Sequence, residues 1–246
     1  GAVQEFVEKT VIRRLSEEGS SSLDELSISP LPLRLDEIFE PEGTDELDDY
    51  AILRWASDLV EPHHLVRNVR RAMWSEEGVS KMHFELAEKW SSREGPRALR
   101  IEAHHRLSSD ELRDADWIMD KIASISSEDS SAAAVILEQA TQLIEEEGLF
   151  EMAADVALER GEAECASSHI ERLTDGPNRK IRESRLARIE GDYSKANEFE
   201  KEAIALMTPA DRARAQISSL VRKFDDRLPG QIEPESVSSI LSEVNL

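Results

Sequence analysis

The chain has 246 residues, of which 39% are hydrophobic, 33% charged and 5% aromatic, a composition that favours a soluble protein built mainly of helices. Its formal net charge of −22 disfavours sequence-independent binding to nucleic acid, because phosphates repel such a surface. The single cysteine excludes an internal disulfide, and without a signal-peptide pattern or an apolar run approaching roughly 18 residues we expect a cytoplasmic protein without membrane spans.

The first part of the chain predicts short helices interrupted by Pro and Gly. Apolar spacing predicts an amphipathic helix over residues 3–15, ended by the Gly-Ser run 19–22, and a short helix over 23–28. Two prolines require an extended segment over 29–33, and another short helix follows at 35–39. Thr44 is a natural N-cap for a further helix, whose apolar face continues to Leu59.

Residues 61–74 join this region to the rest of the chain. Residues 59–61 and 64–66 are predicted to form a minimal extended pair, and Pro62 biases its predecessor away from the helical region. The segment then becomes a helix whose apolar face consists of Leu65, Val69, Ala72 and Met73. This order of elements resembles a winged helix-turn-helix with a very short wing.

Three arginines, Arg67, Arg70 and Arg71, are predicted on the opposite side of that helix, facing away from the core. Two interpretations stay open. They contact an anion or a neighbouring domain, or they form an ordinary helix face that is salt-bridged to nearby carboxylates.

The helix in the position that would read DNA is acidic. Its N-terminal half carries Asp45, Glu46, Asp48 and Asp49, where side chains that contact bases would lie. Because carboxylates would face phosphates there, we expect protein contact at this helix, and a DNA-binding transcription regulator is the alternative function.

The second part of the chain predicts helix after helix. The expected helices cover residues 79–90, 98–107, 111–125, 132–146, 149–160, 162–173, 180–190, 192–207, 211–224 and 234–244. Gly161 and Gly191 each lie between two helices and are about 30 residues apart, which is the spacing of antiparallel helix-pair repeats. We therefore predict a predominantly all-α fold, with a winged-helix-like domain over residues 1–75 and a helical-repeat domain over 76–246.

Residues 191–206 resemble the second half of a tetratricopeptide repeat. Gly191 takes the turn between helices, while Tyr193, Ala196 and Ala203 take packing positions where neighbouring helices approach closely. The segment departs from the pattern at Glu200, where an aromatic residue is usual, and Pro209 comes one residue late. Residues 161–173 are a weaker copy of the repeat. In that copy the corresponding positions are Gly161 and Ala166.

Residues 59–90, followed by 97–122, resemble the segment after the ATPase module in signal-transduction ATPases of the STAND class, including archaeal predicted ATPases. In that class, the short sequence at the end of the winged helix is similar to His64-Leu65-Val66-Arg67 in this chain. The following helices match at His83, Ala87, Trp90, Ala98, Leu99, His104, His105 and Leu107.

This resemblance implies a non-enzymatic regulatory fragment: a winged helix and a helical sensor array that binds a protein or peptide partner in signal transduction. In that class the winged helix packs against the nucleotide module and helps to hold it closed. The sequence contains no GxxxxGK[ST] motif, so ATP and Mg²⁺ are expected only in an ATPase module outside these residues, and no cofactor in this chain. The first residue is Gly, which also suggests a fragment.

Candidate chemistry is sparse. The six histidines include the adjacent pairs 63–64 and 104–105, but no HExxH or CxxC spacing accompanies them, and adjacent residues on a helix point about 100° apart. We therefore predict no metal site and no catalytic residue, and a metal-dependent enzyme is the least favoured alternative. Cys165 is expected to be a small buried thiol. The four tryptophans, Trp55, Trp74, Trp90 and Trp117, are expected to anchor the core.

Overall fold

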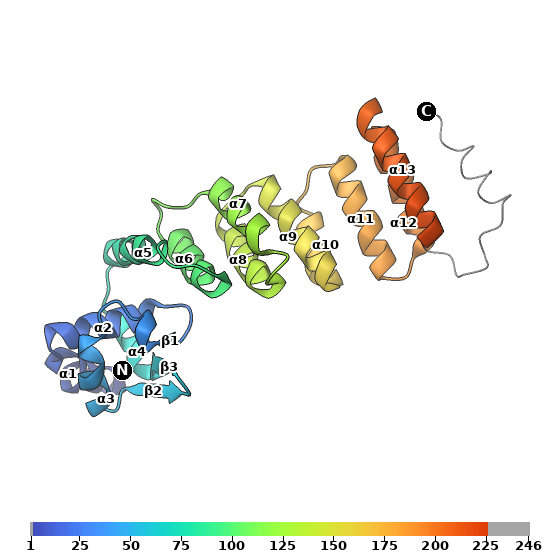
Figure 1. Cartoon of the computed structure of the whole chain (residues 1–246). Helices are drawn as coiled ribbons and strands as arrows, with labels where there is room; N and C mark the ends of the chain where they lie inside the picture. Colours follow the sequence, from blue (N-terminus) through green and yellow to red (C-terminus); the bar gives the residue numbers. More distant parts are fainter. Residues whose placement is uncertain (1, 226–246) are drawn as a thin grey trace. The chain divides into compact units, whose positions relative to one another are not determined.

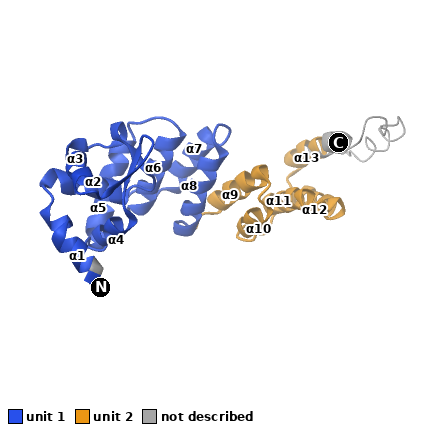
Figure 2. Cartoon of the chain, turned by 90° about the horizontal axis from the view of Figure 1, so that it is seen from below, with its two compact units in different colours: residues 1–144 blue, residues 145–246 orange. Residues whose placement is uncertain are grey.

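The structure is a computed structural model that describes residues 2–225. It is predominantly helical, with a small sheet in its N-terminal part, so the predicted fold class is confirmed at this level (Figure 1). The predicted helix at 234–244 lies outside the described residues. Contacts divide the chain into two compact units, residues 1–144 and 145–246, which Figure 2 colours separately. None of the described helices combines the length and the apolar character that crossing a membrane requires.

Unit 1 (residues 1–144) starts with α1 (Ala2–Thr10), a 3-10 turn (Ile12–Arg14) and α2 (Glu17–Ile28). Then come β1 (Leu33–Arg34), two 3-10 turns (Leu35–Glu37 and Pro41–Gly43), α3 (Thr44–Asp49), β2 (Leu53–Ala56), β3 (Leu59–Pro62) and α4 (His64–Arg71). It ends with α5 (Glu76–Trp90), α6 (Pro96–Ser108), α7 (Ala115–Ile125) and α8 (Ser130–Leu143). The sheet is antiparallel, with the order β1-β3-β2.

Helix α2 passes through the Gly-Ser run that was expected to end a helix, so the predicted break at 19–22 is wrong. Ser16 caps α2 by accepting the Gly19 N–H at 2.9 Å. Gly19 lies against α3, where a Cβ atom would come within 2.1 Å of a Glu46 carboxylate oxygen. Ser22 is fully buried, and its hydroxyl donates to the Glu40 carbonyl. Contacts with residues far along the chain therefore hold this run in the helix.

The predicted helix from 44 to 59 is also wrong, because α3 ends at Asp49 and the chain then forms a hairpin. Ala51 turns the chain with a φ of 54°, and Ser57 closes the hairpin between β2 and β3 with a φ of 60°. Val60 of β3 is fully buried between β1 and β2. Residues 64–66, expected to be extended, instead begin α4, and β3 takes its partners from the other two strands.

One hydrophobic core joins the sheet region to α5 and α6. Its largest fully buried side chains are Leu23, Leu26, Leu33, Leu47, Trp90 and Ile101. Polar groups also close this core: Glu25 is buried and accepts the backbone N–H groups of Phe39 and Glu40. Burial raises the pKa of Glu25, and these two N–H groups oppose the rise. The compact unit that contains this core extends to residue 144. The domain boundary after residue 75 stays a prediction.

Unit 2 (residues 145–246) contains α9 (Glu147–Arg160), α10 (Ala163–Ile170), α11 (Pro177–Ile189), α12 (Tyr193–Leu206) and α13 (Pro209–Asp225). The helices predicted from residue 79 to 224 are thus confirmed, with ends shifted by a few residues. Helices α9 and α10 form one hairpin, and α11 and α12 form the next. Gly161 and Gly191 end α9 and α11 with φ of 73° and 81°, a left-handed conformation that glycine adopts without a steric penalty.

Small residues and a polar ladder pack these hairpins. Ala154 and Ala166 are fully buried where α9 meets α10. Three carboxylates on one face of α9 each accept a hydrogen bond from a residue 27 positions later in the chain. Glu147 accepts from Thr174, Glu151 from Asn178 and Asp155 from Arg182. Because these carboxylates are four residues apart, they line a single face of α9, and we call this set the acidic ladder.

Candidate functional site

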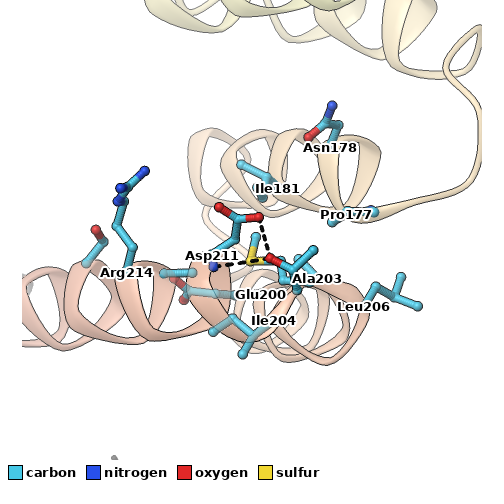
Figure 3. Close-up of a pocket in the computed structure, with 13 residues that line it drawn as sticks. Pro177, Asn178, Ile181, Glu200, Ala203, Ile204, Leu206, Asp211 and Arg214 are labelled. Atoms are coloured by element: carbon cyan, nitrogen blue, oxygen red, sulfur yellow. Dashed lines mark hydrogen bonds between the residues drawn. The ribbon is translucent and has the colours of Figure 1, made fainter. Parts of the chain in front are cut away.

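A groove lies between α11, α12 and α13 within unit 2 (Figure 3). Its volume is about 460 Å³. The lining is mostly apolar: Pro177, Ile181, Ala203, Ile204, Leu206, Met207 and Ala215, with the polar residues Asn178, Glu200, Thr208, Asp211, Arg214 and Ser218. A concave, largely apolar surface with a few polar groups is the usual form of a binding site.

The corner between α12 and α13 builds one wall of this groove. The Thr208 hydroxyl donates to Asp211 at 2.7 Å and accepts the Asp211 backbone N–H at 3.4 Å, as the dashed lines in Figure 3 indicate. Arg212 donates to the carbonyls of Ala205 and Met207 at 3.3 and 3.2 Å. These contacts satisfy carbonyls at the end of α12 and fix the direction in which α13 leaves.

Apolar side chains in the groove remain accessible. Leu206 is 58% exposed and Ile181 is 38% exposed, although both are large and aliphatic. Glu200 stands where the repeat pattern usually has an aromatic residue. It is buried and accepts from Arg188 at 3.2 Å, so the charge of its carboxylate is partly balanced. The groove can therefore take up apolar side chains of a partner without placing them against an uncompensated buried charge.

The predicted repeat-packing positions are placed as follows. Ala166, Ala196 and Ala203 are buried, as close helix packing requires. Tyr193 differs, because it lies at the first residue of α12 and is 58% exposed. The groove itself was not predicted, since its lining comes from three helices whose mutual packing the sequence pattern does not reveal. Exposed aliphatic residues on α11 and α12 were the available signal.

The three arginines of α4 contact other parts of unit 1. Arg70 makes a bidentate ion pair with Asp24 of α2, and Arg71 donates to the Ser27 carbonyl at 2.7 Å. Arg67 donates to Glu61 at 3.2 Å. The expectation that all three point away from the core is wrong for Arg70 and Arg71, which reach back to α2. A contact with an anion or a second domain stays a prediction.

The apolar face of α4 is also rotated from its predicted position. Val66 and Val69 are buried, whereas Leu65 and Met73 are 39% and 38% exposed. Of the predicted apolar residues, Val69 is the one that belongs to the buried face. The apolar spacing therefore predicted the helix but placed its buried face about one residue away from the observed one.

Two further expectations about single residues are corrected. Cys165 is exposed, so it is not a buried core thiol. Trp90 is 1% exposed and anchors the core as predicted, but Trp55 on β2 is 43% exposed, and its indole N–H donates to Asp48 at 2.8 Å. Trp74 is partly buried against the core, and Trp117 stacks against the Arg106 guanidinium with a separation of 4.5 Å.

His83 meets the adjacent pair His104 and His105, which lies far from it in the sequence, within unit 1. His83 from α5 lies against His104 and His105 from α6, and one nitrogen of each ring lies within 4.8 Å of the others. The sequence carries no metal-binding spacing here, because the grouping depends on the antiparallel packing of α5 on α6.

Comparisons of the chain with protein-family models, curated proteins and solved structures give no match.

Proposed function

We propose that this chain is a regulatory interaction module, the partner-sensing part of a signal-transduction ATPase of the STAND class. In this proposal unit 2 binds a peptide segment of a protein partner, and the N-terminal region transmits binding to an ATPase module outside these residues. The observation that carries the proposal is the accessible apolar groove formed by α11, α12 and α13.

The arrangement of the N-terminal region supports the winged-helix part of the proposal. A helix precedes β1, short helical elements follow it, and an antiparallel hairpin of β2 and β3 returns to pair with β1. Helix α3 occupies the position that reads DNA in regulators of this type. The carboxylates of Asp45, Asp48 and Asp49 on this short helix favour a basic protein surface as its neighbour.

The alternative, a DNA-binding transcription regulator, has one feature in its favour. Arg54 and Trp55 are exposed on the hairpin, where a wing would touch a duplex. Titration with duplex DNA at two salt concentrations tests it. Binding that weakens steeply with salt and is lost in Arg54→Glu would favour the regulator over the interaction module.

The chemistry of the groove indicates an occupant with apolar side chains flanked by basic ones. Ile181 and Leu206 offer apolar contacts, and the charged residues Asp211 and Arg214 also line the groove. The chain as a whole carries a formal charge of −22, which attracts a positively charged segment and accelerates its association.

A peptide-selection experiment tests this function. The purified chain is immobilised and screened with a random peptide library, and the affinity of an enriched peptide is measured by fluorescence anisotropy. We expect enriched sequences to combine aliphatic and basic residues. Ile181→Glu and Leu206→Glu should each weaken binding by about tenfold or more, because a carboxylate would be placed against apolar side chains of the peptide.

Ile189→Glu is the matched control, since Ile189 lies on the same helix as Ile181, is 42% exposed and does not line the groove. Equal loss of binding in the control would count against the groove, as would the absence of any enriched peptide. The link to an ATPase is tested separately, by searching the reading frame that encodes this chain for a GxxxxGK[ST] motif preceding Gly1.

A further inference from the structure

The packing of α5 on α6 creates a cluster of three imidazole rings. The ring of His83 lies 5.0 Å from that of His105 and 5.5 Å from that of His104, and the two α6 rings are 5.5 Å apart, all measured between centroids. His104 and His105 point in different directions because they are adjacent on a helix, and His83 enters from α5 between them. The three rings thus form a nearly equilateral triangle.

This triangle has the dimensions of a three-histidine metal site. With Zn–N bonds of about 2.0–2.1 Å and tetrahedral angles, ligand nitrogens lie roughly 3.3 Å apart and ring centroids roughly 5 Å apart. In the cluster one nitrogen from each ring lies within 4.8 Å of the others. The Nδ1 atoms of His83 and His105 are 2.8 Å apart and share a hydrogen bond, which a metal ion bound to both nitrogens would replace.

The hydrogen bond of His104 leaves a nitrogen lone pair of that ring available to bind a metal. His104 Nδ1 is 3.1 Å from the Gln139 side-chain oxygen, so this nitrogen carries the proton and leaves Nε2 of the same ring as the ligand atom. A second-shell partner of this kind commonly orients a metal-binding imidazole. His105 is 1% exposed, and its Nε2 has no hydrogen-bond partner.

The charged groups around the cluster decide what completes the coordination. Arg71 acts electrostatically on His83 and His104, and Arg100 acts on His104. No carboxylate of the described residues belongs to the cluster. The two guanidiniums repel a divalent cation, and an anionic fourth ligand such as hydroxide would offset this repulsion.

We propose that His83, His104 and His105 form a binding site for a divalent transition-metal ion, with Zn²⁺ as the expected occupant, which ties α5 to α6 and leaves a fourth coordination position for hydroxide or another small anion. This site is contrary to the expectation from sequence of no metal in the chain, and it is independent of the groove in unit 2. Imidazole ligands suit zinc, copper, iron and nickel, and zinc needs no redox partner.

The test uses the full chain without an affinity tag, stripped of metal with EDTA. After equilibration with ZnCl₂ and gel filtration, bound zinc is measured by elemental analysis, and affinity is measured by competition with a chromophoric chelator. We expect one zinc ion per chain, and a Co²⁺-loaded sample with the visible absorption of four-coordinate cobalt. His83→Gln and His105→Gln should each lower the affinity by more than about 100-fold, because a primary ligand matters more than a second-shell one.

The double variant His63→Gln/His64→Gln is the matched control, because it removes the other adjacent histidine pair, whose side chains are exposed and outside the cluster. It should keep one zinc per chain. Circular dichroism checks the folding of every variant. Gln139→Leu adds a variant that leaves all three rings in place, and we expect its zinc affinity to fall about tenfold.

Two results would overturn the site. One is a wild-type chain that holds no zinc at micromolar free Zn²⁺. The other is zinc retained with unchanged affinity in His83→Gln and His105→Gln. If those two variants fail to fold, Gln139→Leu decides, and an affinity equal to that of the wild type rejects the assignment.

Discussion

Residues far apart in the sequence build the core of unit 1, whereas in unit 2 each helix packs mainly against its neighbours along the chain. In unit 1 the ion pairs Asp24–Arg70 and Glu37–Arg97 join residues 46 and 60 positions apart. In unit 2 the acidic ladder repeats a spacing of 27 residues, which is about one helical hairpin. The two units therefore differ in how they are held together: elements of unit 1 share one core, and unit 2 is a succession of helical hairpins.

This difference predicts how each unit responds to a change. Removing a large side chain from unit 1 affects many elements at once, because they share one core. Removing a contact from unit 2 affects mainly one interface between hairpins, because stability in a repeat array is nearly a sum of neighbouring terms. Three substitutions test this contrast, in order of decreasing expected effect.

The largest effect is expected from Trp90→Ala in unit 1. Trp90 is 1% exposed, and its ring packs edge-on against Phe39 with centroids 5.6 Å apart. Loss of this side chain should destabilise the chain by about 3–5 kcal/mol, measured by urea unfolding. Hydrogen exchange should show faster opening in α2, α5 and α6 together. Trp55→Ala is the control, and a loss as large as that of Trp90→Ala would contradict the idea of one shared core.

A smaller and more local effect is expected from Asp155→Ala in unit 2. Asp155 accepts from Arg182 at 2.6 Å and from Arg185 at 2.5 Å, and the Arg182 side chain is 11% exposed. The substitution leaves a largely buried guanidinium with fewer partners, so we expect a loss of about 2 kcal/mol. Faster hydrogen exchange should be confined to α9 and α11. Asp175→Ala, at an exposed position in the same unit, is the control, and faster exchange throughout the chain would argue against a repeat array.

The smallest effect is expected from Glu37→Gln, and it depends on pH. Burial raises the pKa of Glu37, but the hydrogen bonds from Arg97 and from the Arg34 backbone N–H, together with the charges of both arginines, outweigh it. The pKa in the folded state therefore lies below the ordinary value of 4.5. The carboxylate therefore stabilises the fold above about pH 4.5, and this contribution is lost as the pH falls through the lower folded-state pKa. At pH 7 the substitution should cost about 1 kcal/mol.

Stability curves of wild type and Glu37→Gln between pH 3 and 7 check this sign, because the two should converge at the acid end. Glu94→Gln, at an exposed position, should leave the curve unchanged. A difference between wild type and Glu37→Gln that grows on acidification would show that the carboxylate does not stabilise the fold in the way the Arg97 contact implies.

The helical hairpins could be predicted from the sequence, whereas the groove and the histidine cluster could not. Gly161 and Gly191 revealed the hairpins, since a left-handed residue between two helices is a local requirement. The groove and the histidine cluster were missed, because packing between helices brings Ile181 and Leu206 to one groove and His83 to His105. The partners of the α4 arginines were missed for the same reason, as Asp24 lies 46 residues from Arg70.

The sequence by itself determined the predominantly helical class, the helices from α5 onward and the positions of their turns. Caps, glycines and prolines act within a few residues, so their effect is readable in one dimension. Tertiary structure decided the N-terminal region. There the Gly-Ser run is helical because Glu40 accepts from Ser22 and because Gly19 packs closely against Glu46. Residues 53–62 form a hairpin because Val60 is buried between two strands. In both places long-range burial and hydrogen bonding outweighed local propensity, which differs by less than about 1 kcal/mol per residue between competing conformations.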